Sequence, residues 1–208
     1  RGGLEINGHA FAVGGGVLAV PVGYGTIAID FSTIAGNTSD AGAGGIEVEQ
    51  VSYLATVNVT NSIVSLNSGV NLGGPLGTGG AINVAYCDFY ADESAENFER
   101  TLSPSVLSVD SESVIFDDPQ MDSDFVPGIC SPTTDAADDS LGCWEGVEPF
   151  PNGQRANMGH LGCTANATQT LPVTNGDRAG DGADILAVAS AFGSISPFSF
   201  DLIWTALN

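Results

Sequence analysis

Two stretches of the chain match position by position: "TIAIDFSTIAGN" (residues 26–37) and "TVNVTNSIVSLN" (residues 56–67). At an offset of 30 residues, Ile27 is aligned with Val57. Each copy contains a short apolar/polar alternation, a polar step, a second β-branched run and a final asparagine. Self-similarity at a fixed period, with several short strands in each unit, predicts a solenoid.

A parallel β-helix explains why the repeated residues are alike. Each strand stacks about 4.8 Å from the equivalent strand of the next coil, so equivalent positions touch. Asn37 and Asn67 are therefore predicted to form a ladder of side-chain amides. The alternative is a β-sandwich with coincidentally similar strands. Gly-rich turns also recur, in "GGGVLAV" (14–20) and "GAGGIEV" (42–48), and a third round begins with "GTGGAINVAYCDF" (77–89), which favours the solenoid.

The charge of the chain is strongly unbalanced. Its 208 residues include 25 acidic and 4 basic side chains, for a net charge of −21. Nucleic-acid binding is excluded as an interpretation, because it depends on Lys and Arg that neutralise phosphates. A polyanionic polysaccharide would need a bridging divalent cation. We expect no membrane span, since no apolar run reaches about 18 residues.

The four cysteines indicate disulfides rather than zinc. None of them forms a CxxC pair, and the chain has only two histidines. In an extracellular setting two disulfides have three possible connectivities. We favour Cys143–Cys163 together with Cys87–Cys130.

Four segments resemble a known protein group in their order and spacing. They are "VNVTNSIVSLNSG" (57–69), "INVAYCDF" (82–89), "IFDDPQMDSDFVPGICSPTTDAADD" (115–139) and "EPFPNGQRANMGHLGCTANAT" (148–168). Together they are similar to the C-terminal region of secreted bacterial right-handed parallel β-helix proteins, the pectate-lyase-like group. The resemblance extends over about residues 14–168.

The resemblance implies a fold and a location. We expect an all-β chain, with a right-handed parallel β-helix of about three coils and a loop-rich cap in residues 1–168. A small C-terminal helical unit would occupy residues 169–208. The protein is expected to be extracellular or on the cell surface. The fold alone does not define an activity.

The cap contains one of the few cations of the chain. Closing segments cover the apolar end of a solenoid, and Pro149 and Pro151 prevent further strand addition. We expect Arg155 to clamp the cap through a bidentate pair with Asp135 or Asp138. The alternative is a catalytic arginine.

Catalysis is disfavoured by the residues available. A polysaccharide lyase needs a base and a cation that neutralises the uronate carboxylate, and the chain has no lysine. Hydrolases of this fold use aspartates, and residues 104–125 contain several: Asp110, Asp117, Asp118, Asp122 and Asp124. We interpret these as a solvated acidic face. Three coils also leave little length for a sugar-binding groove.

The tail resembles the calcium loop of dockerin-type repeats followed by an amphipathic helix. Matching residues to that loop gives the calcium ligands Asn175, Asp177, Asp181 and Asp184, with the carbonyl oxygen of Ala179. Val173 and Arg178 depart from the pattern, which weakens the predicted affinity. The alternative is a relic loop that caps the helix. The last residues, "SPFSFDLIWTALN" (196–208), are apolar, and we expect them to fold back as a second helix or to pack on a neighbour.

These features favour a non-catalytic structural or surface protein. Its β-helical rod would self-assemble into a filament or matrix, or mediate adhesion to other surface proteins. The expectation of assembly rests on the absence of an evident N-terminal cap and on the apolar end of the chain. The alternatives are a polysaccharide-binding or polysaccharide-degrading module and a calcium-dependent docking module.

Overall fold

The computed structural model describes residues 5–6, 9–13, 16–19, 25–48, 56–74, 80–91, 95–98, 106–138, 140, 147–149 and 155–169. Its strands are β1 (Glu5–Ile6), β2 (His9–Val13), β3 (Val17–Ala19), β4 (Thr26–Asp30), β5 (Thr33–Ala35), β6 (Thr38–Ala41), β7 (Ile46–Val48), β8 (Thr56–Thr60), β9 (Ile63–Ser65), β10 (Val70–Gly73), β11 (Ala81–Ala85), β12 (Asp88–Tyr90), β13 (Glu96–Phe98) and β14 (Leu107–Val109). The predicted all-β class is confirmed for this part of the chain. The predicted helical unit lies beyond the last described residue.

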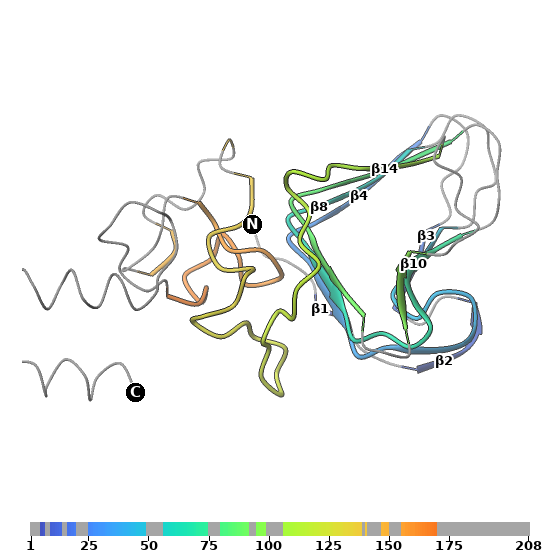
Figure 1. The fold of residues 1–208 in the computed structure, drawn as a ribbon, viewed down its shortest axis with the longest axis horizontal. Helices are drawn as coiled ribbons and strands as arrows, with labels where there is room; N and C mark the ends of the chain where they lie inside the picture. The colour runs from blue at the N-terminus through green and yellow to red at the C-terminus, as the bar shows by residue number, and fades with distance from the viewer. Residues whose placement is uncertain are drawn as a thin grey trace, which may run out of the picture.

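The strands form three four-stranded parallel sheets and one two-stranded sheet (Figure 1). We call β4-β8-β11-β14 sheet I, β1-β5-β9-β12 sheet II and β3-β7-β10-β13 sheet III; β2 pairs with β6. The chain passes from sheet I to sheet II to sheet III and then returns to sheet I one strand further along. Figure 1 shows the three sheets surrounding a common interior. This winding is consistent with a parallel β-helix.

The register between the strands confirms the repeat. Ile27 pairs with Val57, and Val57 pairs with Ile82. Ile82 in turn pairs with Leu107. Because these pairs are parallel and in register, the alternative of a sandwich of antiparallel layers is excluded. The period itself changes: paired residues of β4 and β8 are 30 residues apart, as are Asn37 and Asn67, whereas those of β8 and β11 are 25 apart, as are Asn58 and Asn83.

Apolar columns fill the interior. The column of sheet II contains Ile34, Val64 and Phe89, all with no exposed surface. In sheet III, Ile46 pairs with Leu72, and both are also fully buried. β-branched and aromatic residues suit such columns because each side chain packs on its equivalent one coil away.

The predicted asparagine ladder is confirmed and is longer than expected. Asn37 donates to Asn67 Oδ1 from its side chain at 2.9 Å and from its main chain at 3.0 Å. Asn67 Nδ2 donates to Asn71 Oδ1, and Asn71 Nδ2 to Asn97 Oδ1, both at 2.9 Å. These bonds satisfy polar groups that would otherwise be buried without partners.

The corner between sheets I and II repeats the same backbone conformation. Phe31, Asn61 and Tyr86 follow β4, β8 and β11, and all three have left-handed backbones, with φ of 43°, 51° and 51°. Non-glycine residues rarely adopt this region. Its recurrence shows that the corner geometry, and not one residue type, is repeated in each coil.

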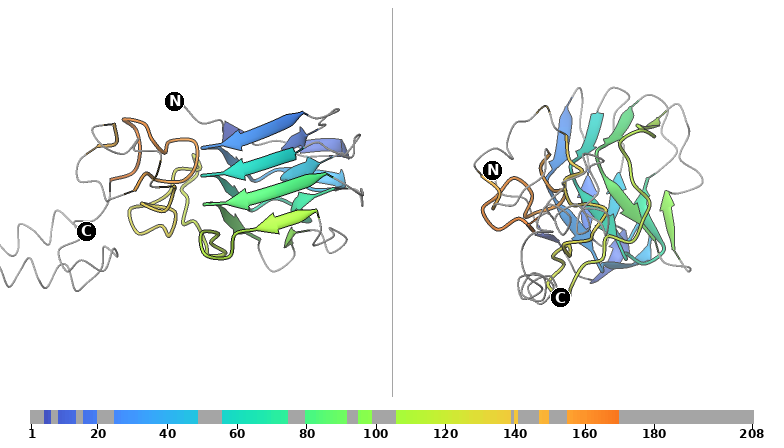
Figure 2. Two further views of the ribbon diagram at one scale, coloured as in Figure 1. Left: turned by 90° about the horizontal axis from the view of Figure 1, so that it is seen from above. Right: turned by 60° about the vertical axis from the view of Figure 1, so that its left-hand side comes forward.

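The loop-rich cap lies beside the coils. We use the name cap for the described residues in 117–138, 147–149 and 155–169. An apolar cluster joins its Ala137, Ala156 and Met158 to Phe31 and Ile63 of sheet II and its corner. In Figure 2 the cap lies to one side of the stacked strands. The expected position over the end of the solenoid is therefore wrong for these residues, because the outer face of sheet II also needs covering.

Candidate functional site at the seam between sheet II and the cap

The seam is built on a row of residues that points outward from sheet II. Thr33 pairs with Ile63, Ile63 with Asp88, and Asp88 forms a bridge with Ile115. Thr33, Ile63 and Asp88 have no exposed surface. Cap residues pack on Ile63 and bind Thr33, and Asp117 and Asp118 of the cap lie near Asp88. Sheet II is thus buried on both faces, which is typical of parallel strands.

The coil that contains β5 binds the cap through hydrogen bonds. Thr33 Oγ1 accepts from the main-chain nitrogen of His160 at 3.1 Å and lies 2.9 Å from His160 Nδ1. At the neighbouring corner, the main-chain oxygen of Asn61 accepts from Gly159 at 2.9 Å. Its side-chain oxygen accepts from the main-chain nitrogen of Asp138 at 2.8 Å. These contacts align the cap with the coils that contain β5 and β8.

Asp88 is the exception in this row. Neither oxygen of its buried carboxyl group has a hydrogen-bond partner. Burial, together with the like charges of Asp117 and Asp118, raises the pKa of Asp88 to about 8. A carboxyl group in this environment is neutral over much of the physiological range. The sequence prediction did not single out Asp88.

Arg155 contacts the segment predicted for it, but through different atoms. Its Nε donates to the carbonyl oxygen of Ala137 at 2.6 Å, and its Nη2 to that of Ala136 at 2.8 Å. The guanidinium also lies 5.4 Å from the centre of the Tyr86 ring. These bonds go to main-chain carbonyls beside Asp135 and Asp138, and the carboxylate pair with either residue stays a prediction. The planar fork of arginine fits two adjacent carbonyl oxygens as well as it fits one carboxylate.

The Arg155 clamp can be tested by a charge-preserving substitution. We expect Arg155→Lys to lower the free energy of unfolding by about 2 kcal/mol, because an ammonium group lacks the fork that binds both carbonyls. Asp138→Asn is the control and should change it by less than about 0.5 kcal/mol. Urea denaturation followed by far-UV circular dichroism measures both. An equal loss in the two variants would favour the carboxylate pair instead.

Glu148 organises the inside of the cap. Its Oε1 accepts from the main-chain nitrogens of Asn157 at 3.0 Å and Cys163 at 2.7 Å. Burial raises the pKa of Glu148, the two hydrogen bonds lower it, and Asp135 raises it. A buried carboxylate that binds two N–H groups is typical of structural turns. The only sequence signal was an acidic residue directly before the proline-rich "PFPNG" stretch.

The cysteines correct one predicted disulfide. Cys87 and Cys130 are free, so the pair Cys87–Cys130 is wrong. Cys87 occupies the position of Ser32 and Ser62 in earlier coils. Its Sγ lies 3.2 Å from the carbonyl oxygen two residues before it, and the two serine hydroxyls donate to the equivalent carbonyl oxygens. Cys163 is disulfide-bonded. Its predicted partner Cys143 lies outside the described residues, so that pairing stays a prediction.

The two free thiols should differ sharply in reactivity. Cys87 has no exposed surface, and burial raises its thiol pKa to about 12, whereas Cys130 is exposed. Because the thiolate is the reactive form, iodoacetamide should label Cys130 in the native protein and Cys87 only after denaturation. Peptide mass spectrometry measures both sites. Labelling of Cys87 at a comparable native rate would contradict its burial.

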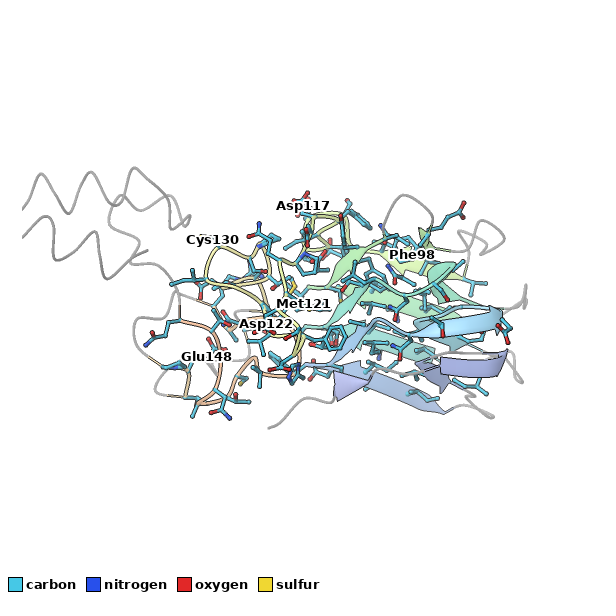
Figure 3. All side chains as sticks on the ribbon, turned by 90° about the horizontal axis from the view of Figure 1, so that it is seen from below. Phe98, Asp117, Met121, Asp122, Cys130 and Glu148 are labelled. Atoms are coloured by element: carbon cyan, nitrogen blue, oxygen red, sulfur yellow. The ribbon has the colours of Figure 1, made fainter. Side chains whose placement is uncertain are left out.

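The other predicted site residues separate into two groups. The aspartates of residues 104–125 are exposed at every predicted position, and three of them bind main-chain N–H groups of turns: Asp110, Asp118 and Asp122. Figure 3 shows Met121 near the boundary of strands and cap, with Asp122, Cys130 and Glu148 in the cap.

The calcium ligands Asn175, Asp177, Ala179, Asp181 and Asp184 lie outside the described residues. Within the described part, no group of three or more acidic, histidine or cysteine side chains is arranged for a metal ion.

The fold and the seam define a class: an all-β chain of stacked parallel strands with a cap packed on one outer face. Comparisons with protein-family models, with curated proteins and with solved structures found no match. The resemblance to the pectate-lyase-like group and to dockerin loops therefore stays a prediction.

Proposed function

We propose that this chain is a non-catalytic structural or surface protein of the extracellular space. Its core would be a right-handed parallel β-helix of about three coils, which forms a stiff rod that assembles with copies of itself or adheres to other surface proteins. The small helical tail and its weak calcium loop would belong to the same rod. In the described residues, no helix is long and apolar enough to cross a lipid bilayer.

One observation carries the proposal: in the described part of the chain, the groups with shifted pKa values are buried inside the fold. Such groups often mark active sites when they line a cleft. Here Cys87 and Asp88 have no exposed surface, and Glu148 is 5% exposed. Their pKa shifts arise mainly from burial: Cys87 lies inside the coils, Asp88 at the seam and Glu148 in the cap. Their environment therefore supports a structural role for each group.

Imaging tests the structural proposal most directly. Electron microscopy of concentrated protein, with and without calcium, should show rods or networks that grow with concentration. Calcium is included because a net charge of −21 opposes contact between copies. Separate particles under all conditions would contradict assembly. Release of reducing sugars or unsaturated uronates from a polysaccharide panel would contradict the non-catalytic part.

A second candidate function is supported by the outer face of sheet I. Its outward side chains are small and mostly uncharged, including Thr26, Ala28, Asn58, Asn83 and Ser108. Asn83 Nδ2 donates to Asn58 Oδ1 at 2.9 Å, so two amides lie side by side on this surface. A neutral polysaccharide would fit this face better than an acidic one. Co-sedimentation with insoluble neutral polysaccharides, compared between the native chain and Asn83→Arg, tests this candidate.

A further inference from the structure

Among the described residues at the seam between sheet II and the cap, Asp88 is a carboxyl group that the packing leaves wholly unsatisfied. In the outward row, Thr33 binds His160 and Ile63 packs in the apolar cluster of the cap. Asp88 is equally buried, yet both of its carboxyl oxygens lack a hydrogen-bond partner. It lies in register between the apolar Ile63 and Ile115. A charge at this position would be both desolvated and unpaired.

The charged groups around this position do not compensate for such a charge. Asp117 and Asp118, from the segment that follows Ile115, act on Asp88 as like charges. The basic side chains described on the cap are held elsewhere: Arg155 binds the carbonyls of two alanines and the Tyr86 ring, and His160 binds Thr33. The buried neighbour Cys87 is a neutral thiol. Ionised Asp88 would therefore face repulsion without a described counter-charge.

We propose that Asp88 is a proton-operated latch, which holds the cap on sheet II while the carboxyl group is neutral and loosens it when the proton leaves. An unpaired carboxylate in an apolar setting is costly, and opening of the seam lets water reach it. Opening of the seam does not require the coils to unfold, because the apolar cluster inside the coils is separate from the one under the cap.

The direction of the pH effect follows from linkage. The pKa of Asp88 rises from 3.8 when it is solvated to about 8 in the closed seam. Between these values the closed form binds more protons than the open form, so closure weakens as the pH rises. The effect is absent below about pH 4 and complete above about pH 8. Within this window, each pH unit should raise the open-to-closed ratio by up to about tenfold.

Hydrogen exchange of cap amides tests the latch. The amides of Gly159 and Asp138 bind the main-chain and side-chain oxygens of Asn61 across the seam in the closed form, so they report on opening. After correction for intrinsic exchange, their protection should fall by on the order of tenfold per pH unit between pH 5 and 7. Amides inside β8 and β9 should change much less. A pH-independent cap, or an equal fall in the strands, would overturn the proposal.

Two sets of variants separate the latch from general acid effects. Asp88→Asn removes the titrating group with little change in shape, so the pH slope of the cap should disappear, whereas Asp122→Asn on the exposed surface should keep it. If Asp88→Asn does not fold, the double variant Asp117→Asn, Asp118→Asn should raise cap protection at pH 8, because it removes the like charges. A slope that survives in Asp88→Asn, or protection that the double variant leaves unchanged, contradicts the latch. Calcium alone restoring protection at pH 8 would also overturn it, in favour of a cation site.

Discussion

Replacing Asn67 by alanine is expected to lower the free energy of unfolding by about 4 kcal/mol. The Asn67 side chain is buried and makes four hydrogen bonds: it accepts two from Asn37 and donates to Ile34 and to Asn71. Alanine would leave groups of the preceding coil and of its own coil without these partners. Each buried group left unsatisfied costs about 1–3 kcal/mol, so the loss exceeds that of a single bond.

Asn58→Ala is the matched control for the ladder. Asn58 also forms an amide pair with the next coil, through Asn83, but on the outer face of sheet I, where water replaces the lost bond. Its substitution should cost less than about 1 kcal/mol. Urea denaturation followed by far-UV circular dichroism compares the two variants. If both cost the same, the buried ladder does not stabilise the coils beyond a surface pair.

The first two copies of the repeat predicted this ladder only as far as Asn67. A period of 30 places Asn37 on Asn67, and that contact is present. The continuation through Asn71 and Asn97 could not be predicted from the same period, because the next coil is five residues shorter at the equivalent register (Asn58 to Asn83 against Asn37 to Asn67). The ladder continues because a second asparagine of the same coil, Asn71, bonds to Asn67 and to Asn97 of the next coil.

Two adjacent apolar residues in β9 indicate where the cap lies, although the repeat alone does not. Ile63 and Val64 are adjacent and apolar, so one of them must point outward from a strand. A strand that is apolar on both faces is typical of a sheet covered on both sides. The end-cap interpretation considered only the interior column. The outward Ile63 is the residue on which the cap cluster packs.

Cys87 is a second residue whose state follows from its position within the coil. An even number of cysteines in a secreted chain favours disulfides, which led to the wrong Cys87–Cys130 pair. Aligned by coil, Cys87 follows Ser32 and Ser62, which are buried in the fold. A small side chain that can donate to a nearby carbonyl suits this position, and a thiol meets that requirement weakly. Position within the coil predicts the state of this cysteine better than parity does.

Gly159→Ala is expected to destabilise the seam by about 3–4 kcal/mol, the second large effect. Gly159 has a φ of +86°, and an added Cβ would lie 2.7 Å from Thr33 Oγ1 and 2.9 Å from Ile63 Cδ1. The methyl group would thus displace the cap from both residues and weaken the bond between Thr33 and His160. Gly159 is required by its backbone conformation and by its closeness to sheet II.

Gly69→Ala separates these two requirements. Gly69 also has a left-handed backbone, with a φ of +74°, but an added Cβ would meet nothing within 4 Å. Its substitution should therefore cost only the backbone strain, about 1 kcal/mol. Hydrogen exchange should show cap amides opening in Gly159→Ala while strand amides stay protected, and neither change in Gly69→Ala. Equal costs for the two variants would mean that the close contact with Thr33 and Ile63 does not hold the cap, and the seam would then depend on the Arg155 clamp and on the Asn61 hydrogen bonds instead.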